Sequence, residues 1–387
     1  MTDTENNKNS NSPVLRFPGF TEPWKKCRLG DYIRIFSGES PNCVSSKFGI
    51  IPYYKVEQLN WCEKYLGETP YLSQRGKNIL PEGCVVFSKR GAAILTNKVR
   101  MNLFPINIDT NLMGIKADNS FISDQYLFYF ILRARLSRIA DTSTIPQINN
   151  IHINPITIHV PSLEEQEKIT RSLGLLDERI ATQRRLIEDL EKLKSSIVDR
   201  TFSDVDGEVV KYRDLLEVSN LRNDGKADYR ILSASQEFGM IERESLDIDI
   251  KAEAKSVKAY KRVQAGDYVL HLRSFQGGLA FAEVGGICSP AYTILRPNKR
   301  LEYGYLKEYF KSSKFIKSLV FVTYGIRDGR SINVDEFLDM TISIHSKDKQ
   351  AEIVKSLSIL SVKLNVEASI LNIYEQQRNY LHGNLFI

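Results

Sequence analysis

The sequence lacks the patterns of a secreted, membrane-spanning or zinc-binding protein. Its 387 residues include only five cysteines, widely spaced and without a C-x-x-C pair, so they predict free thiols rather than a disulfide framework or a zinc site. No apolar run approaches the roughly 18 to 20 residues that cross a bilayer. The first dozen residues, MTDTENNKNSNS, are polar and lack the plan of a signal peptide. These absences predict a soluble, cytoplasmic protein.

The chain also lacks the signatures of common active sites. No G-x-x-x-x-G-K-[ST] phosphate loop occurs, and GIRDGRS at 325 has the wrong spacing and no lysine. GGLAFAEVGG at 277 lacks the strand-turn-helix setting of a dinucleotide loop, and the loops of amino-methyltransferases are absent. DIDIK at 247 is the nearest approach to a metal nuclease site, and the five histidines are scattered. We therefore predict no catalytic residue, no metal site and no cofactor in this chain.

Positive charge is in slight excess, mainly in the first half. The formal net charge is +6. Residues 1–163 hold 19 Lys or Arg against 13 Asp or Glu, whereas residues 204–345 hold 21 of each kind. A basic surface fits a polyanionic partner such as DNA, although many proteins that never bind DNA carry a surplus of this size.

What the sequence does contain is a long internal repeat. SLEEQEKITRSLGLLDERI at 162 aligns without a gap with SKDKQAEIVKSLSILSVKL at 346, which places Gln166 over Gln350. PEGCVVFSKR at 81 matches QAGDYVLHLR at 264, with Gly83 over Gly266, and QINNIHI matches SINVDEF. A repeat of about half the chain predicts two similar domains, each followed by a long helix.

Each long helix carries an apolar seam at heptad spacing. The seam positions are Ile169, Leu173, Leu176, Ile180, Ile187 and Leu190 in the first helix and Ile353, Leu357, Leu360, Leu364, Leu371 and Tyr374 in the second. Both seams are interrupted at equivalent places, by Gln183 and Glu367 and again by Lys194 and Arg378. An apolar stripe on a helix needs a partner, so we predict that the two helices pack together. The alternative, packing helices of two unrelated domains, leaves the shared spacing to chance.

Short strands and a few helices are predicted for the globular parts. GIIPYYKV at 49, CVVFSKRGAAIL at 84 and NLFPINID at 102 are rich in β-branched and aromatic residues and are bounded by turn formers. SDQYLFYFILRARLSRIA predicts one helix over 123–140. Ser162 and Glu165 predict a capping box at the start of the first long helix. The predicted fold class is mixed α/β (α+β).

Several of these segments resemble the specificity (S) subunits of type I restriction-modification systems. The resemblance rests on RFPGFTEPWKKCRLGDYI at 16, on SLEEQEKITRSLGLLDERIATQRRLIEDLEKLKSSI and its second copy, and on the QINN and SINV turns before ITIHVP and MTISIH. It implies two target-recognition domains separated by two long antiparallel coiled-coil helices, with a pseudo-twofold repeat. The expected bounds are a disordered tail at 1–14, a first recognition domain at 15–161, a first spacer helix at 162–203, a second recognition domain at 204–345 and a second spacer helix at 346–387.

The resemblance implies a non-catalytic subunit that reads a bipartite, asymmetric target in double-stranded DNA. It would dock two methyltransferase (M) subunits and restriction/motor (R) subunits, which would bring S-adenosylmethionine, ATP and Mg for DNA adenine methylation and for cleavage in defence against foreign DNA. The second helix lacks the Pro and the Glu pair found at 161–165, so docking at that end is expected to be less symmetric. The alternatives are a stand-alone sequence-specific DNA-binding regulator and a nuclease with an unrecognised site.

Basic and amide side chains near the repeated turns are the candidates for DNA contact. Such side chains read base edges, and basic or hydroxyl groups bind phosphates. The candidates are Lys89, Arg90, Lys98, Arg100, Gln147 and Asn149 in the first domain and Arg273, Arg327, Arg330, Ser331 and Asn333 in the second. For each one alone, a solvated surface residue or a turn that satisfies its own backbone is an equal alternative.

Overall fold

The computed structural model divides the chain into two compact units. Unit 1 comprises Met1–Arg184 with Ser369–Ile387, and unit 2 comprises Arg185–Ala368. The described residues are 12–40, 49–74, 78–141, 145–203, 205–223, 225, 229–235, 238–245, 257–271, 278–324 and 331–387. Outside them lie residues 1–11 of the expected tail, Cys43, DIDIK at 247, most of GIRDGRS at 325, Arg273, Arg327 and Arg330.

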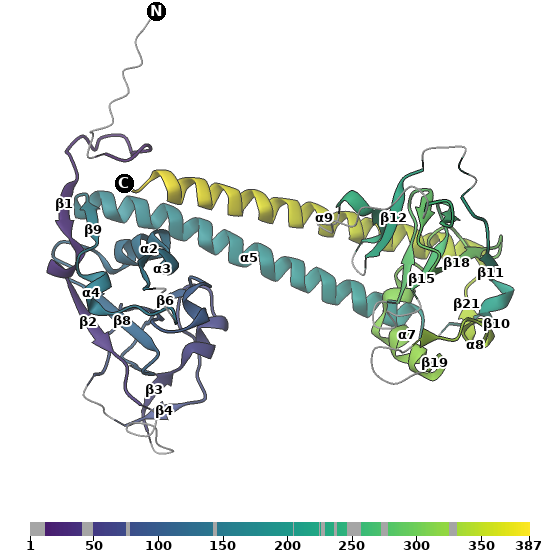
Figure 1. Cartoon of the computed structure of the whole chain (residues 1–387), viewed down its shortest axis with the longest axis horizontal. Coiled ribbons are helices and arrows are strands. Elements are labelled where there is room, and N and C mark those ends of the chain that lie inside the picture. Colours follow the sequence, from purple (N-terminus) through teal and green to yellow (C-terminus); the bar gives the residue numbers. More distant parts are fainter. Residues whose placement is uncertain are drawn as a thin grey trace, which may run out of the picture. The chain divides into compact units, whose positions relative to one another are not determined.

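Unit 1 contains two sheets and a two-stranded ribbon (Figure 1). The antiparallel four-stranded sheet has the order β2 (Ile33–Ser37), β8 (Leu112–Ala117), β5 (Val85–Ser88) and β6 (Val99–Met101). The second sheet has the order β4 (Leu72–Ser73), β3 (Ile51–Tyr54) and β7 (Asn107–Ile108), with β3 and β7 parallel. The ribbon pairs β1 (Lys25–Arg28) with β9 (Thr157–Val160). The helices are α2 (Asp124–Ala134), α3 (Leu136–Ile139) and α4 (Asn150–Ile153), with 3-10 turns η1 (Leu29–Asp31), η2 (Val56–Asn60) and η3 (Ala92–Ile94).

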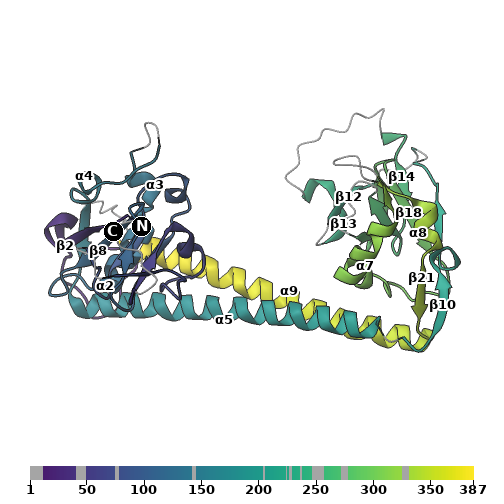
Figure 2. The same cartoon turned by 90° about the horizontal axis from the view of Figure 1, so that it is seen from below.

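Unit 2 repeats this plan. Its antiparallel sheet has the order β11 (Leu216–Ser219), β18 (Tyr292–Pro297), β15 (Tyr268–His271) and β16 (Leu279–Phe281). A second sheet has the order β13 (Gly239–Glu242), β12 (Ile231–Ser235), β17 (Gly286–Cys288) and β14 (Lys261–Val263), with β12 and β17 parallel. The pairs are β10 (Glu208–Lys211) with β21 (Thr341–Ile344), side by side in Figure 2, and β19 (Thr323–Tyr324) with β20 (Ser331–Ile332). The helices are α7 (Ser313–Ser318) and α8 (Val334–Asp339), with 3-10 turns η4 (Tyr212–Asp214), η5 (Arg243–Ser245), η6 (Tyr309–Lys311) and η7 (Leu319–Val322).

The sheet that contains β5 and the sheet that contains β15 are each covered on two faces, and these central strands show why. Along β5, Val85 and Phe87 enter one hydrophobic core, whereas Val86 enters a second core. Along β15, Tyr268 enters one core and Val269 another. Because successive side chains of a strand point to opposite faces, a strand between two cores needs a continuous apolar run. The unbroken apolar stretches CVVF and YVL meet that requirement.

The single helix predicted over 123–140 is broken in the structure. α2 begins after Ser123, whose Oγ accepts a hydrogen bond from the Tyr126 amide at 3.2 Å. It ends at Ala134, because Arg135 adopts a φ of +56°, which no α-helix accommodates. α3 then starts at Leu136. The prediction of one continuous helix was therefore wrong at Arg135.

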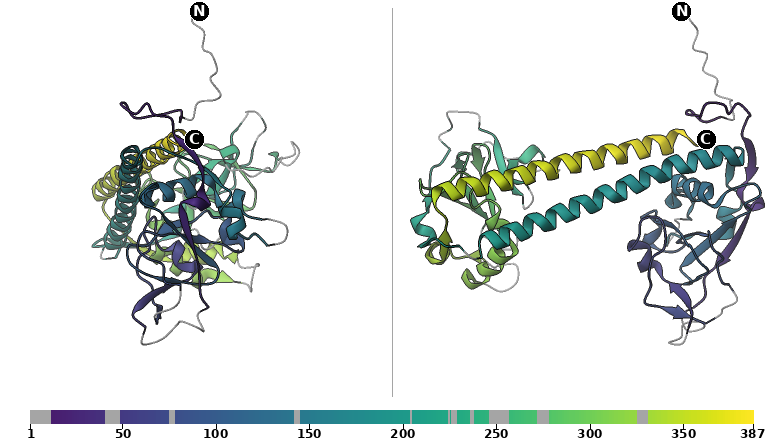
Figure 3. Two further views of the ribbon diagram at one scale, coloured as in Figure 1. Left: turned by 90° about the vertical axis from the view of Figure 1, so that its left-hand side faces the viewer. Right: turned by 180° about the vertical axis from the view of Figure 1, so that it is seen from behind.

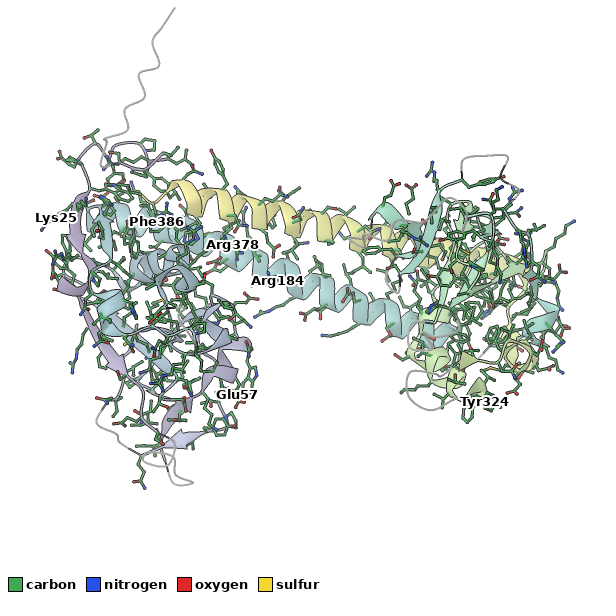
Figure 4. All side chains as sticks on the ribbon, viewed as in Figure 1. Lys25, Glu57, Arg184, Tyr324, Arg378 and Phe386 are labelled. Atoms are coloured by element: carbon green, nitrogen blue, oxygen red, sulfur yellow. The ribbon has the colours of Figure 1, made fainter. Side chains whose placement is uncertain are left out.

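The long helices α5 (Leu163–Thr201) and α9 (Lys347–Asn384) each contribute to both units. Within unit 1 the first part of α5 lies beside the last part of α9 (Figure 3). Arg184 of α5 binds Glu375 of α9 at 2.6 Å, and Asp177 of α5 lies 3.7 Å from Arg378 of α9. The later residue of α5 thus contacts the earlier residue of α9, as antiparallel helices require. Arg184 and Arg378 are labelled in Figure 4. The antiparallel packing expected from the resemblance is confirmed.

The seam residues are most deeply buried where the helices adjoin the domain cores. Buried seam residues are Ile169, Leu173, Leu176 and Ile180 in unit 1 and Ile353 and Leu357 in unit 2. Half-buried ones are Ile187, Leu190, Leu360, Leu364, Leu371 and Tyr374. The polar interruptions Gln183 and Glu367 are buried as well. The basic interruptions are neutralised within their own units, Lys194 by Glu308 at 2.8 Å and Arg378 by Asp177.

A buried glutamine anchors the start of each long helix to its domain. In unit 1, Oε1 of Gln166 accepts from the Ser123 amide at 2.8 Å, and Nε2 donates to the carbonyl oxygens of Phe121 and Pro161 at 2.9 and 3.0 Å. Gln350 repeats this arrangement in unit 2, at 2.7, 3.1 and 3.0 Å, with Glu302, Arg300 and His345. The repeated glutamine therefore satisfies backbone groups that the domain leaves open next to the helix.

Replacing Gln166 with leucine is expected to destabilise unit 1 by about 3 kcal/mol. Leucine keeps the side-chain volume but leaves three backbone groups without their partner, and each buried unsatisfied group costs about 1–3 kcal/mol. Urea unfolding followed by hydrogen exchange of each unit measures the effect. Gln376→Leu, at an exposed position of α9 in the same unit, is the matched control and should stay within about 0.5 kcal/mol. Equal losses for both variants would contradict the role of Gln166.

The capping box predicted at the start of α5 forms only in part. Oγ of Ser162 accepts from the Glu165 amide at 3.3 Å, as predicted. The Glu165 carboxylate instead accepts two hydrogen bonds from the Arg16 guanidinium, at 2.8 and 3.0 Å. A bidentate, charge-assisted pair is stronger than a capping bond to a neutral amide. The predicted return bond from Glu165 was therefore wrong, and Glu165 ties the segment before β1 to the helix.

Candidate nucleic-acid interface

Four of the candidate DNA-contacting residues come together in the first domain. Arg90 forms an antiparallel bridge with Gln147, and the Ile148 amide donates to the Lys89 carbonyl oxygen at 2.9 Å. Asn149 follows at the N-cap of α4, where its amide donates to Nδ1 of His152. Arg90 and Asn149 are exposed, and Lys89 and Gln147 are half-buried. The loop after β5 and the turn before α4 thus form one surface with two basic and two amide side chains.

Lys89 lies in a positive, partly buried environment on this surface. Burial lowers the pKa of the Lys89 amine, Arg90 lowers it further, and Asp109 opposes both effects. A nearby anion favours the protonated amine. An anion beside Lys89 would therefore oppose the lowering of its pKa.

Lys98 and Arg100 make structural contacts elsewhere in the first domain. The Arg100 guanidinium donates to the carbonyl oxygens of Leu59 and Val99 at 3.0 and 2.8 Å. The Lys98 amine donates to the side-chain oxygen of Asn60. Both side chains thereby hold η2 against β6.

In the second domain, Ser331 and Asn333 are the candidates within the described residues. Ser331 lies in β20 opposite Tyr324. Oδ1 of Asn333 accepts from the amides of Asp335 and Glu336, at 3.1 and 3.3 Å, and so caps α8. The cap explains why an asparagine recurs at this turn, since Asn149 holds the equivalent N-cap position. Arg273, Arg327 and Arg330 lie outside the described residues and stay predictions.

Cys84 and Cys288 are buried, free thiols. Burial raises the pKa of both Cys84 and Cys288 to about 12, so at neutral pH these thiols are not thiolates. Within the ranges that the structure describes, no three His, Cys, Asp or Glu side chains are grouped so as to hold a metal ion. No helix in those ranges is long and apolar enough to cross a membrane.

Sequence reasoning missed a second basic region. RARLSR at 133 contains three arginines, and this density was the local signal available. The structure places Arg133 and Arg135 on the wall of a cavity of about 470 Å³ in unit 1. The rest of its wall comes from the residues after η2, from Asn97 and β6, from α2, from α5 and from α9, which no sequence motif connects.

Comparison with known proteins relates this architecture to a family. Residues 21–192 match the family described as "Type I restriction modification DNA specificity domain". The type I restriction enzyme MjaVIII specificity subunit of Methanocaldococcus jannaschii is 26% identical over 198 residues, covering 49% of this chain and 43% of that protein. The putative type I restriction enzyme MjaX specificity subunit of the same organism is 24% identical over 183 residues, covering 46% and 42%. The matches span less than half the length of these curated relatives.

The fold has a counterpart that extends over both units. The crystal structure of a type I restriction-modification system S subunit from M. genitalium superimposes with a TM-score of 0.59 and 14% identity, covering 97% of this chain and 99% of that one. At this identity the likeness establishes the fold, two β-rich domains with two long helices packed together. Taken with the match of residues 21–192, it makes the chain similar to the type I restriction-modification DNA specificity (S) subunits, in sequence over about half of its length and in fold over both units.

Proposed function

We propose that the chain is the DNA sequence-recognition subunit of a type I restriction-modification complex and has no catalytic activity of its own. The observation that carries this proposal is the duplicated fold. Both units share the same four-strand order and the same antiparallel ribbon, yet their loops carry different side chains. Two recognition domains that share one fold but differ in their surfaces suit a bipartite, asymmetric target in double-stranded DNA.

Exposed apolar side chains on the long helices support docking of partner helices. In unit 2, Ile359, Val362 and Val366 of α9 are 62, 62 and 48% exposed. Their spacing of three and four residues places them on one face, distinct from the seam at Ile353 and Leu357. An apolar face of this kind marks an interaction surface. Two M subunits are the proposed occupants, with R subunits joining the complex.

The partners supply the chemistry in this proposal. Methyltransferase subunits use S-adenosylmethionine to modify adenine, and the motor subunits use ATP and Mg for cleavage, while this chain selects the site. The complex acts on DNA in the cytoplasm.

Co-purification separates this proposal from its alternatives. The chain expressed with its M subunits should co-purify with them and methylate DNA. The chain alone should neither methylate nor cleave DNA. Tight sequence-specific binding by the chain alone, with no M subunit retained, would favour a stand-alone regulator. Metal-dependent cleavage by the isolated chain would favour a nuclease.

Exchanging residues 204–339 for the corresponding segment of a relative should change one half of the recognised sequence. The other half should stay as it was, because each unit has its own cores, on both faces of the sheet around β5 in unit 1 and around β15 in unit 2. Mapping methylated adenines in a host genome reads out both halves. The reciprocal exchange of residues 15–161 is the control and should change the opposite half. Alteration of both halves by either exchange would contradict two independent readers.

A further inference from the structure

The cavity of about 470 Å³ in unit 1 has an excess of basic side chains. Its charged lining consists of Lys64, Arg100, Arg133, Arg135, Arg378, Glu63 and Asp177. Both acids are already paired, Glu63 with Arg184 and Asp177 with Arg378 and with the Tyr129 hydroxyl, which donates at 2.7 Å. Lys64, Arg100 and Arg135 form no ion pair with a carboxylate in the described part of the chain. The cavity therefore holds positive charge that the protein itself does not neutralise.

One of these cations is held in an unfavourable backbone conformation. Asn97 and Arg135, with φ of +50° and +56°, are the non-glycine residues at positive φ among those described, and both line the cavity. The Asn97 side chain donates to the Leu132 carbonyl oxygen and accepts from the Leu136 amide, both at 2.9 Å. This clamp fixes the one residue between α2 and α3. A strained arginine persists only where its surroundings hold it, and such strain concentrates at functional sites.

The Arg135 side chain is free to bind a ligand. It is exposed, and its guanidinium makes no hydrogen bond or ion pair with another residue that the structure describes. Arg133, on the same wall, is half-buried and donates to the main-chain oxygen of Ile387 at 2.9 Å.

The electrostatics of the neighbouring groups point the same way. Burial lowers the pKa of the Lys64 amine, although Asp177 and Glu178 oppose this. Burial also lowers the pKa of the Arg133 guanidinium. For His382, burial is the main cause of a lowered pKa, and Arg133 lowers it further. A bound anion would oppose each of these shifts, because it favours the protonated form of every group around it.

We propose that this cavity binds a phosphate group, with the Arg135 guanidinium as its principal ligand and the Lys64 amine as a second one. A guanidinium offers two parallel N–H donors that match two phosphate oxygens. A phosphate can carry two negative charges, which suits a wall with several unpaired cations better than a carboxylate does. The volume lies in the range of small-molecule sites. The source of the phosphate is either a free nucleotide or the DNA backbone.

Phosphate binding by matched arginine variants tests the proposal. The full-length chain is titrated calorimetrically with inorganic phosphate, with adenosine monophosphate and with a short DNA duplex of random sequence. Arg135→Gly removes the guanidinium at a φ that glycine adopts without strain, so the melting temperature should hold or rise. Arg138→Ala removes the same charge from an exposed residue of α3 that does not line the cavity. Loss of a charge-assisted hydrogen bond should weaken binding about tenfold or more in the first variant only.

Each outcome decides whether the cavity binds phosphate or which source the phosphate has. Saturable binding of phosphate or adenosine monophosphate that Arg135→Gly weakens and Arg138→Ala preserves supports a free ligand. The same pattern with the duplex alone supports a backbone phosphate. Lys64→Met, which removes the amine that lies 4.6 Å from the centroid of the Tyr129 ring, is the second variant and should weaken binding of the same ligand. Absence of saturable binding, or equal binding by all variants, overturns the proposal. The titration needs no partner subunit or target sequence, so its failure leaves the proposed function untouched.

Discussion

Replacing Phe386 with alanine is expected to destabilise unit 1 by about 3–5 kcal/mol, the usual cost of removing a buried phenylalanine. Phe386 is 3% exposed and belongs to the main core of unit 1. Its ring lies 5.0 Å from that of Tyr126 and 5.5 Å from that of His382. Figure 4 labels Phe386 beyond the end of α9. The core of the first domain therefore depends on residues from the far end of the chain.

The repeat provides the matched control for this experiment. Phe202 takes the equivalent place in unit 2, where its ring lies 5.3 Å from Tyr305 and 4.7 Å from Tyr309. Each long helix thus starts in one unit and ends with a phenylalanine in the core of the other. Phe202→Ala should destabilise unit 2 and leave unit 1 unchanged.

Hydrogen exchange measured separately on peptides of α2 and of β15 distinguishes the two variants, since local stability is read unit by unit. Phe386→Ala should lower protection in α2, and Phe202→Ala should lower it in β15. Tyr380→Ala, at a position of α9 that is 59% exposed, should change stability by no more than about 0.5 kcal/mol. Loss of protection confined to α9, with α2 unaffected, would show that the first core does not need Phe386.

Features that depend on local geometry were predictable from the repeat. Gly83 and Gly266 align in the sequence, and both adopt a positive φ, +78° and +98°, in the turns before β5 and β15. Such a turn favours glycine in either domain. Gln166 and Gln350 align for a similar reason, because each bonds to backbone groups that recur with the fold. Two local alignments, shifted by 183 residues for the glycines and by 184 residues for the glutamines, detect these positions without knowledge of distant partners.

Features that depend on distant partners were not predictable. Glu165 has the spacing of a capping residue, but Arg16 takes its carboxylate. The sequence from 123 to 140 is apolar enough for one helix, but the Asn97 side chain fixes a break at Arg135. Nothing in the residues around either position encodes the competing contact.

The candidate DNA surface was predictable in part. The aligned turns brought Lys89 and Arg90 together with Gln147 and Asn149, since a repeated turn implies a repeated place in the fold. Lys98 and Arg100 bind backbone and amide oxygens near η2. Basic character alone did not distinguish them from basic side chains that are available to a ligand. Whether a cation is free depends on the carbonyl groups around it, which a sequence does not display.

The two long helices are expected to set the number of base pairs between the two half-sites. Neither domain recognises the bases in this gap. α5 has 39 residues and α9 has 38, so each is about 57–59 Å long at ~1.5 Å per residue. That length exceeds one turn of DNA, ~34–36 Å. If the helices act as the spacer, lengthening both by the same amount should lengthen the gap in the recognised sequence and leave both half-sites unchanged.

Duplicating residues 177–183 in α5 and 361–367 in α9 adds one heptad to each helix at equivalent positions. Seven residues advance the helix by about 10 Å and leave the apolar stripe only ~20° from its former direction, so the seam should stay intact. At ~3.4 Å per base pair, the gap should grow by about three base pairs. Duplicating only residues 182–183 and 366–367 turns the stripe by about 200° and should abolish methylation, because the seam residues then face away from their partners. Methylation mapping of both variants decides the matter: an unchanged gap in an active seven-residue variant, or full activity in the two-residue variant, would show that another part of the protein sets the spacing.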